Sequence, residues 1–208
     1  MGQPVAYTDH ERRLIATHEA GHATMAWLTA PERRLEVLTI VKRRSALGLL
    51  AHGDREDVFT RSRTEMQALI QIAMGGQCAE ELFFGDVSTG PGGDLLYATN
   101  AAAEMVGAHG MDDSLVSYAA VQSSFGGTNL VGRVLADDRG RDAVERVLQE
   151  QRAVAKRLLT EHRHLVEALR DALVEQEELV GSQITDVLEA AAAAPRMVDL
   201  TGAPARTS

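Results

Sequence analysis

The sequence predicts a mainly α-helical fold with a small β-sheet and a helical C-terminal half. Apolar residues recur at helical spacing in several long stretches, whereas only residues 35–51 alternate as strands do. The chain has 208 residues, of which 45% are hydrophobic and 25% charged. This is the composition of an ordinary globular protein, and it is enough for one large domain or two small ones.

The first helix is expected at about residues 10–28, with Asp9 as its N-cap, and it contains the motif HEAGH at residues 18–22. Its residues at i, i+4, i+8 and i+11 have the spacing of a buried, amphipathic helix face. They are Leu14, His18, His22 and Met25. Both histidines are therefore predicted to point inward, where an imidazole without a partner would be costly.

Two histidines four residues apart on a helix lie about 40° apart and can bind one metal ion. Glu19 projects about 100° from His18, so it is predicted to reach water beside the metal instead of the metal itself. This is the division of labour in a zinc hydrolase, with two histidine ligands and a glutamate as general base. A site of two histidines and a carboxylate also suits Fe²⁺.

Two strands are expected next, at residues 35–41 and 46–51, joined by a basic turn at 42–44 into an antiparallel hairpin. A small sheet beside a metal-binding helix offers an edge to which an extended peptide can add. The hairpin could equally serve only to cover the core. Residues 54–60 are expected to form a polar loop.

A long apolar helix is expected at residues 64–84 and is interrupted by Gly75-Gly76, a pair that marks a close helix crossing or a kink. Glycine also costs the first helix about 1 kcal/mol at Gly21, which indicates that space is needed there. The expected core face consists of Met66, Leu69, Ile70, Ala73, Met74 and Leu82. Cys78 is interpreted as a small core residue.

A third helix is expected at about residues 94–108, after the Gly/Pro-rich stretch 88–94. Asp94 has two interpretations, as an N-cap or as the carboxylate that completes a metal site. The expected core face of this helix consists of Leu95, Ala98, Ala102 and Met105.

The remainder is predicted to be helical except for residues 111–137, where glycines suggest a loop with little regular structure. Helices are expected at 138–159 and 164–175, and Ser182 is expected to cap a last one. The small, polar residues 195–208 are expected to be a disordered tail.

The sequence leaves the third metal ligand open. The extended pattern HExxHxxGxxH would need glycine at Met25 and histidine at Leu28, so that class is excluded. The candidates are Asp94, Glu80, Glu81, His52 and His109. Glu80 and Glu81 could instead accept a hydrogen bond from a metal-bound histidine.

Several functional classes are not expected from composition. The net charge of −9 and an aromatic content of 4% argue against a nucleic-acid partner. A single cysteine excludes an internal disulfide and fits a reducing compartment. No 18-residue apolar run, signal peptide or P-loop motif occurs in this sequence.

Four motifs in order resemble the peptidase domain of the FtsH family of membrane-anchored, ATP-dependent zinc metalloproteases. They are HEAGHA at 18–23, ALG at 46–48, GG at 75–76 followed by AEE at 79–81, and STG at 88–90 with Asp94 leading into ATN at 98–100. The similarity covers roughly residues 10–190.

The resemblance implies Zn²⁺ bound by His18, His22 and Asp94, with Glu19 as the base. One of Glu80 and Glu81, with Glu80 favoured, would orient a histidine, and Ala46, Leu47 and Gly48 would contact substrate. It also implies an N-terminal extension at 1–9, a zinc-peptidase core at 10–110 and a C-terminal helical part of the same domain at 111–194.

The resemblance further implies a hexameric peptidase acting on unfolded proteins in the cytoplasm. The AAA+ ATPase and membrane segments of the family are absent from this sequence, so the chain is either an excised fragment or a stand-alone relative. Two other interpretations stay open. One is a module that binds zinc and peptides but cleaves poorly without an ATPase partner. The other is a helical scaffold in which the histidines are incidental.

Overall fold

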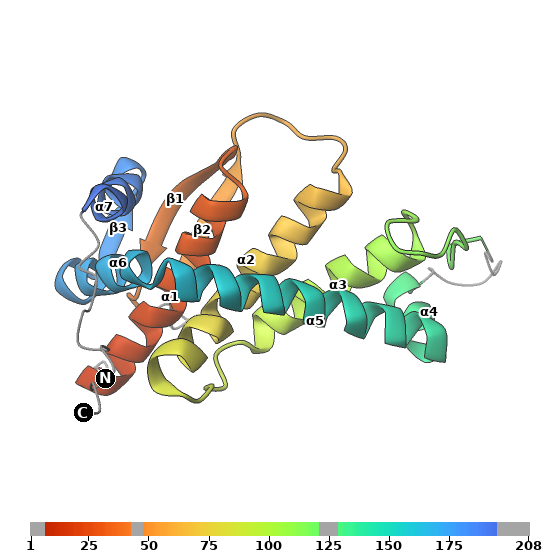
Figure 1. Ribbon diagram of the computed structural model, residues 1–208, viewed down its shortest axis with the longest axis horizontal. Coiled ribbons are helices and arrows are strands. Elements are labelled where there is room, and N and C mark those ends of the chain that lie inside the picture. The colour runs from red at the N-terminus through yellow and green to blue at the C-terminus, as the bar shows by residue number, and fades with distance from the viewer. Residues whose placement is uncertain (1–6, 43–47, 121–128, 195–208) are drawn as a thin grey trace, which may run out of the picture.

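The computed structural model describes residues 7–42, 48–120 and 129–194, which form seven helices and a three-stranded sheet (Figure 1). The helices are α1 (Asp9–Thr29), α2 (Arg63–Phe84), α3 (Gly92–Gly107), α4 (Leu130–Ala136), α5 (Asp138–Glu161), α6 (Arg163–Gln176) and α7 (Ser182–Ala193). The strands are β1 (Arg33–Thr39), β2 (Leu49–Asp54) and β3 (Glu178–Val180). The predicted fold class, mainly helical with a small sheet, is confirmed.

Helix α1 lies at the centre of the molecule. Every residue from Ile15 to Ala26 is buried, because α2, α5, α6 and β1 surround it. The expectation of an amphipathic helix with one buried face is therefore wrong for this segment. The helix begins with a capping box in which Thr8 and Glu11 each accept a hydrogen bond from the other's backbone N–H. Asp9, predicted as the N-cap, is instead the first helical residue.

The sheet has the strand order β2-β1-β3 and is antiparallel throughout. The predicted hairpin is confirmed as the β1–β2 pair, although β2 begins only at Leu49 and runs to Asp54. The predicted basic turn falls largely on residues 43–47, outside the described residues. Strand β3 was not predicted, because three residues are too short to show a period. Strand β2 is left with one edge that pairs with no other described strand.

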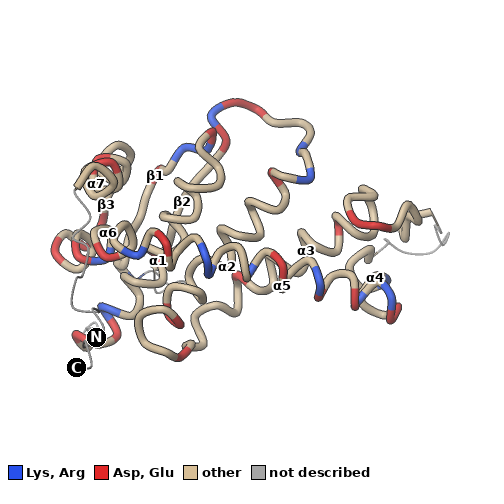
Figure 2. Tube along the Cα trace, in the orientation of Figure 1, with Lys and Arg blue, Asp and Glu red and all other residues tan. Residues whose placement is uncertain are grey.

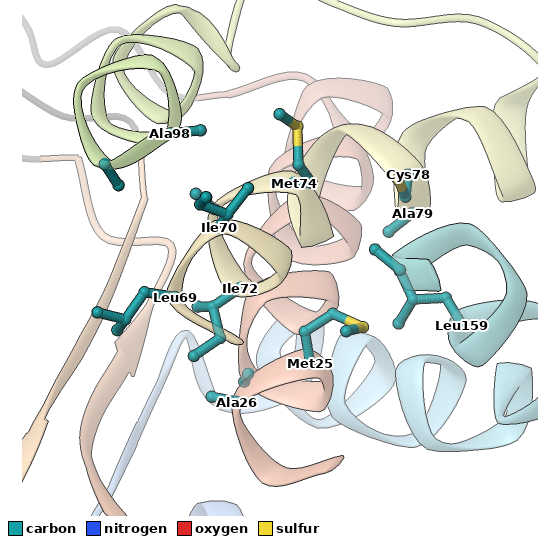
Figure 3. Packing of buried hydrophobic residues seen from close by; sticks show 14 of the residues in the cluster. Met25, Ala26, Leu69, Ile70, Ile72, Met74, Cys78, Ala79, Ala98 and Leu159 are labelled. Atoms are coloured by element: carbon teal, nitrogen blue, oxygen red, sulfur yellow. The ribbon is translucent and has the colours of Figure 1, made fainter. Parts of the chain in front are cut away.

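Helices α1 and α2 cross with their backbones in contact. A Cβ atom built on Gly21 would lie 2.4 Å from the carbonyl oxygen of Gly75, and one built on Gly75 would lie 2.7 Å from that of Gly21. Helix α2 continues through this point without interruption. Of the two predictions for the glycine pair, a close helix crossing or a kink, the close crossing is confirmed. Figure 3 shows side chains of α2 pointing to Met25 of α1, Ala98 of α3 and Leu159 of α5.

Three predictions for the other helices are wrong in detail. Residues 129–137 contain the short helix α4, which Asn129 caps through the Gly132 N–H and which buries Val134. Helix α7 is preceded by Gly181 at φ 52°, and Ser182 makes no capping hydrogen bond. Leu95 is 40% exposed, and the buried residues of α3 begin only at Ala98.

Helices from both halves of the chain share one hydrophobic cluster, which extends from Ile15 on α1 to Leu188 on α7. The predicted core face of α2 is buried except for Leu82, which is half-buried. Figure 2 shows acidic and basic residues interspersed along α5 and the neighbouring helices. None of the described helices has the length and apolarity needed to cross a membrane. The predicted disordered tail lies outside the described residues.

The helix crossing gives a stability prediction. Gly21→Ala should lower the free energy of unfolding by about 1–3 kcal/mol, because the new methyl group meets backbone that cannot move away cheaply. Helix propensity alone predicts the opposite sign, a rise in the free energy of unfolding of up to about 1 kcal/mol. Gly92→Ala is the control, since nothing lies within 4 Å of its built Cβ and no loss is expected. Urea unfolding of both variants measures the difference; a stabilised Gly21→Ala variant would contradict the crossing.

Candidate metal centre

Three side chains from two helices meet at one point. His18 and His22 project from α1, and Asp94 projects from the first turn of α3. The Nε2 atoms of the two histidines are 2.9 Å apart, and Asp94 Oδ2 lies 3.1 Å from that of His18 and 3.4 Å from that of His22. Among the described residues, these three form the group whose possible ligand atoms all lie within 4.8 Å of one another.

The other ring nitrogen of each histidine has a hydrogen-bond acceptor on α2. His18 Nδ1 lies 2.7 Å from Glu80 Oε1, and His22 Nδ1 lies 2.7 Å from the Ile72 carbonyl oxygen. A neutral imidazole has one N–H, and a carbonyl oxygen can only accept, so His22 is protonated at Nδ1. His18 Nδ1 likewise faces an acceptor, so when both rings are neutral their Nε2 lone pairs meet next to the Asp94 carboxylate.

The electrostatics favour a positive charge at this point. Burial lowers the pKa of His18, but its hydrogen bonds with Asp94 and Glu80 outweigh this and raise the pKa to about 9. Burial raises the pKa of Asp94, whereas its contacts with His18 and His22 lower it well below the usual range. In the metal-free chain a proton can supply that positive charge, and metal binding would release it.

The donor set fits a divalent transition-metal ion. Ligand atoms bonded at about 2.0–2.1 Å to a tetrahedral ion lie roughly 3.3 Å from one another, close to the separations observed here. Two imidazole nitrogens and one carboxylate oxygen suit Zn²⁺, and they suit Fe²⁺ as well. All three residues line one cleft, so an ion held by them would be accessible from that cleft.

Glu80 connects His18 to the loop that leads to Asp94. Its side chain is almost fully buried, and besides His18 it accepts hydrogen bonds from the backbone N–H and the hydroxyl of Ser88. Gly85, at φ 70°, ends α2 and turns the chain back toward α1. The N-cap of α3 is Pro91, and Asp94 makes no capping hydrogen bond, so the N-cap interpretation of Asp94 is wrong.

Glu81, the neighbour of Glu80, faces another helix. Its carboxylate pairs with Arg152 and with Lys156, both on α5, the latter at 3.2 Å. Glu80 therefore contacts His18, whereas Glu81 joins α2 to α5. Cys78 is fully buried nearby, where burial raises the pKa of its thiol to about 11, as expected of a core residue.

Glu19 lies beside the three ligand atoms and lines the cleft. Burial raises the pKa of its carboxyl group, although the interactions with His22 and His18 act in the opposite direction. Gly48, the residue before β2, packs against this carboxylate: a built Cβ would lie 2.5 Å from Glu19 Oε1. Ala46 and Leu47, the other two residues expected to contact substrate, lie outside the described residues.

The cleft has a volume of about 780 Å³ and runs between α1, β2, α2 and the start of α3. Its polar residues include the two histidines, Glu19 and Asp94. Its apolar wall consists of Leu14, Ile15, Leu69, Ile72 and Ala73. The size and mixed lining are those of a site for a small molecule or a short stretch of peptide.

The other two ligand candidates do not join the group. His52 lies on β2 and accepts a hydrogen bond from Arg33, and His109 is exposed beyond the end of α3. The sequence analysis missed two contacts to the ligands. The Ile72 carbonyl has no sequence signal, because every residue has one. Gly76, which packs against the ring of His18, was noted only as part of the helix crossing.

A helical domain with two histidines and an aspartate around a point beside a glutamate is typical of a metallopeptidase. The family model of peptidase family M41 matches residues 5–187. The chain belongs to peptidase family M41, which confirms the predicted resemblance.

Curated relatives match over nearly the whole chain. The chain is 34% identical over 193 residues to ATP-dependent zinc metalloprotease FtsH 4 of Sphaerobacter thermophilus, covering 88% of this chain and 29% of that protein. It is 36% identical over 197 residues to ATP-dependent zinc metalloprotease FtsH of Akkermansia muciniphila, covering 89% and 24%. The chain thus spans less than a third of the length of these relatives.

Proposed function

We propose that the chain is a zinc-dependent endopeptidase that hydrolyses peptide bonds of unfolded proteins. The observation that carries this proposal is the buried carboxylate of Glu19 beside three convergent ligand atoms in an open cleft. Two relatives named zinc metalloproteases support zinc as the metal. His18, His22 and Asp94 would hold the ion, and Glu80 would orient His18 through Nδ1.

Bound zinc supplies Lewis acidity, which makes water a stronger acid and polarises a carbonyl group. The remaining chemistry belongs to Glu19. Its carboxylate takes a proton from a water molecule in the cleft as the oxygen of that water bonds to the carbonyl carbon of the peptide. Glu19 then passes the proton to the leaving amine when the C–N bond breaks. Burial raises the pKa of Glu19, which suits a group that accepts and then returns a proton near neutral pH.

The substrate is proposed to bind in extended form along β2. This strand lies at an edge of the sheet, and Gly48, Leu49 and Leu50 line the same cleft as Glu19. Strand addition uses backbone hydrogen bonds, so it accepts peptides of many sequences. It also requires an extended chain, which supports unfolded proteins as the substrate class.

The longer protein is proposed to include an ATPase, since the relatives are named ATP-dependent. By the family resemblance, the domain is expected to act on the cytoplasmic side of a membrane-anchored protein. A second proposal, that the chain alone binds zinc and peptide but cleaves poorly, is favoured by the small share of its relatives that the chain spans. Cleavage of casein, an unstructured protein, by the chain alone separates the two.

The first test is Glu19→Gln. Glutamine keeps the shape of glutamate but cannot accept the proton, so peptidase activity should fall by at least ~10²-fold. Zinc content should stay unchanged, because Glu19 is not among the three convergent ligands. Casein hydrolysis and elemental analysis measure the two quantities. Turnover like that of the unsubstituted chain would remove Glu19 from the mechanism.

The second test compares three carboxylates. Asp94→Ala should abolish zinc binding, and Glu80→Gln should weaken it by ~10–100-fold, the usual effect of losing the partner of a ligating histidine. Glu81→Gln is the matched control: it lies one residue from Glu80 but pairs with α5, so zinc affinity should not change. Competition with a chelator measures affinity. An Asp94→Ala variant with unchanged affinity would exclude the proposed ligand set.

The third test concerns self-association, which the family resemblance implies as a six-membered ring. Light scattering of the chain at tens of micromolar, where mass action favours assembly, should show a species larger than a monomer. A monomer throughout this range would mean that the domain alone does not form the ring.

A further inference from the structure

A chain of four polar side chains runs across β1 and β2 to the cleft. Arg61 and Arg33 both bind the carboxylate of Asp54, the latter at 2.6 Å. Arg33 also donates from Nε to His52 Nδ1 at 2.8 Å. His52 lies on β2 and lines the same cleft as His22 and Glu19. This network has no part in the proposed metal centre.

The network determines which nitrogen of His52 carries a proton. A guanidinium group can only donate, so Nδ1 of His52 must accept, and the neutral ring must carry its proton on Nε2. Burial and the charges of Arg33 and His22 lower the pKa of His52 to about 4. At neutral pH the ring is therefore uncharged and offers one N–H, on the side away from Arg33.

Asp54 and Arg61 hold this arrangement in place. Two hydrogen bonds join Arg61 to the Asp54 carboxylate, and the Arg33 side chain is largely buried against it. Arg33 is thus held by Asp54 while it donates to His52. A donor whose tautomer is set before the substrate arrives loses little entropy on binding it.

We propose that His52 donates a hydrogen bond from Nε2–H to a backbone carbonyl of the peptide bound along β2, which makes it a substrate-binding residue. The inference rests on the proposed function. The proposed acceptor is a carbonyl group because backbone carbonyls are the one acceptor that an unfolded polypeptide offers whatever its sequence. His52 is on the edge strand itself, where such a carbonyl would pass.

The first arm of the test reads the tautomer directly and does not need activity. A ¹H–¹⁵N correlation spectrum of the imidazole nitrogens at pH 7, recorded on the full chain as purified, should show His52 neutral and protonated at Nε2. His52→Gln assigns the signals. In Arg33→Met, which removes the donor to Nδ1, the signals should shift toward a mixture of tautomers. A ring protonated at Nδ1 in the unsubstituted chain would overturn the proposal.

The second arm measures binding and cleavage of peptides without acidic side chains, so that carbonyl groups are the acceptors. His52→Leu should raise KM roughly three- to tenfold, the usual effect of losing one hydrogen bond, with kcat within about twofold. The same loss should appear as weaker peptide binding to chains that also carry Glu19→Gln. His52→Gln should recover most of the affinity, because its amide can accept from Arg33 and donate to the peptide.

His109→Leu is the matched control, since His109 is exposed and outside the cleft lining, and its KM should not change. Thermal midpoints verify that each variant is folded. If the unsubstituted chain cleaves peptides normally and His52→Leu has an unchanged KM, the role of His52 is overturned while the proposed function stands. An effect seen only with acidic peptides would also overturn it, in favour of a carboxylate acceptor. If the unsubstituted chain neither binds nor cleaves any peptide, the proposed function fails, and this inference fails with it.

Discussion

The geometry of the metal centre depends on how closely α1 and α2 approach each other. Gly21 and Gly75 place the two backbones in contact, and both histidines of α1 then reach acceptors on α2. The distance between packed helices depends on the side chains at their contact, so a larger residue at either glycine would move α2 and its acceptors away from the histidines. Gly76 extends the same constraint to His18, whose ring occupies the space that a side chain would need. Packing of small residues thus determines the orientation of the histidine nitrogens proposed to bind the metal.

Burying several ionisable groups together is costly unless each has a partner, and Glu80 is the partner of the His18 Nδ1 atom. It accepts from His18 on one side and from Ser88 on the other. Because Ser88 belongs to the loop that leads into α3, the residue that contacts one proposed ligand, His18, also contacts the segment that leads to another, Asp94. The centre is therefore a single network across α1, α2 and α3.

The cleft has a metal side and a sheet side, and each is held by its own charges. On the metal side, Asp94 Oδ2 lies within 3.4 Å of the Nε2 atoms of both histidines. On the sheet side, Asp54 binds two arginines, one of which sets the tautomer of His52. Glu19 lies between them, in contact with Gly48, the residue before β2. An extended peptide beside β2 would meet the base and the sheet together, which is consistent with hydrolysis close to the edge strand.

The sequence by itself determined the features that depend on local spacing. Histidines four apart on a helix share a face in any fold, and glycines in the interior of a helix indicate a close contact. The helix propensities and the pattern of the hairpin likewise depend on residues that are close together in the sequence. Only the tertiary structure decided which carboxylate joins the histidines, because Asp94 is 76 residues from His18. It also separated Glu80 from Glu81: adjacent helical residues point about 100° apart, and the helix packed on each side determines their partners. Strand β3, helix α4 and the tautomer of His52 depended on long-range contacts that leave no periodic signal in a single chain.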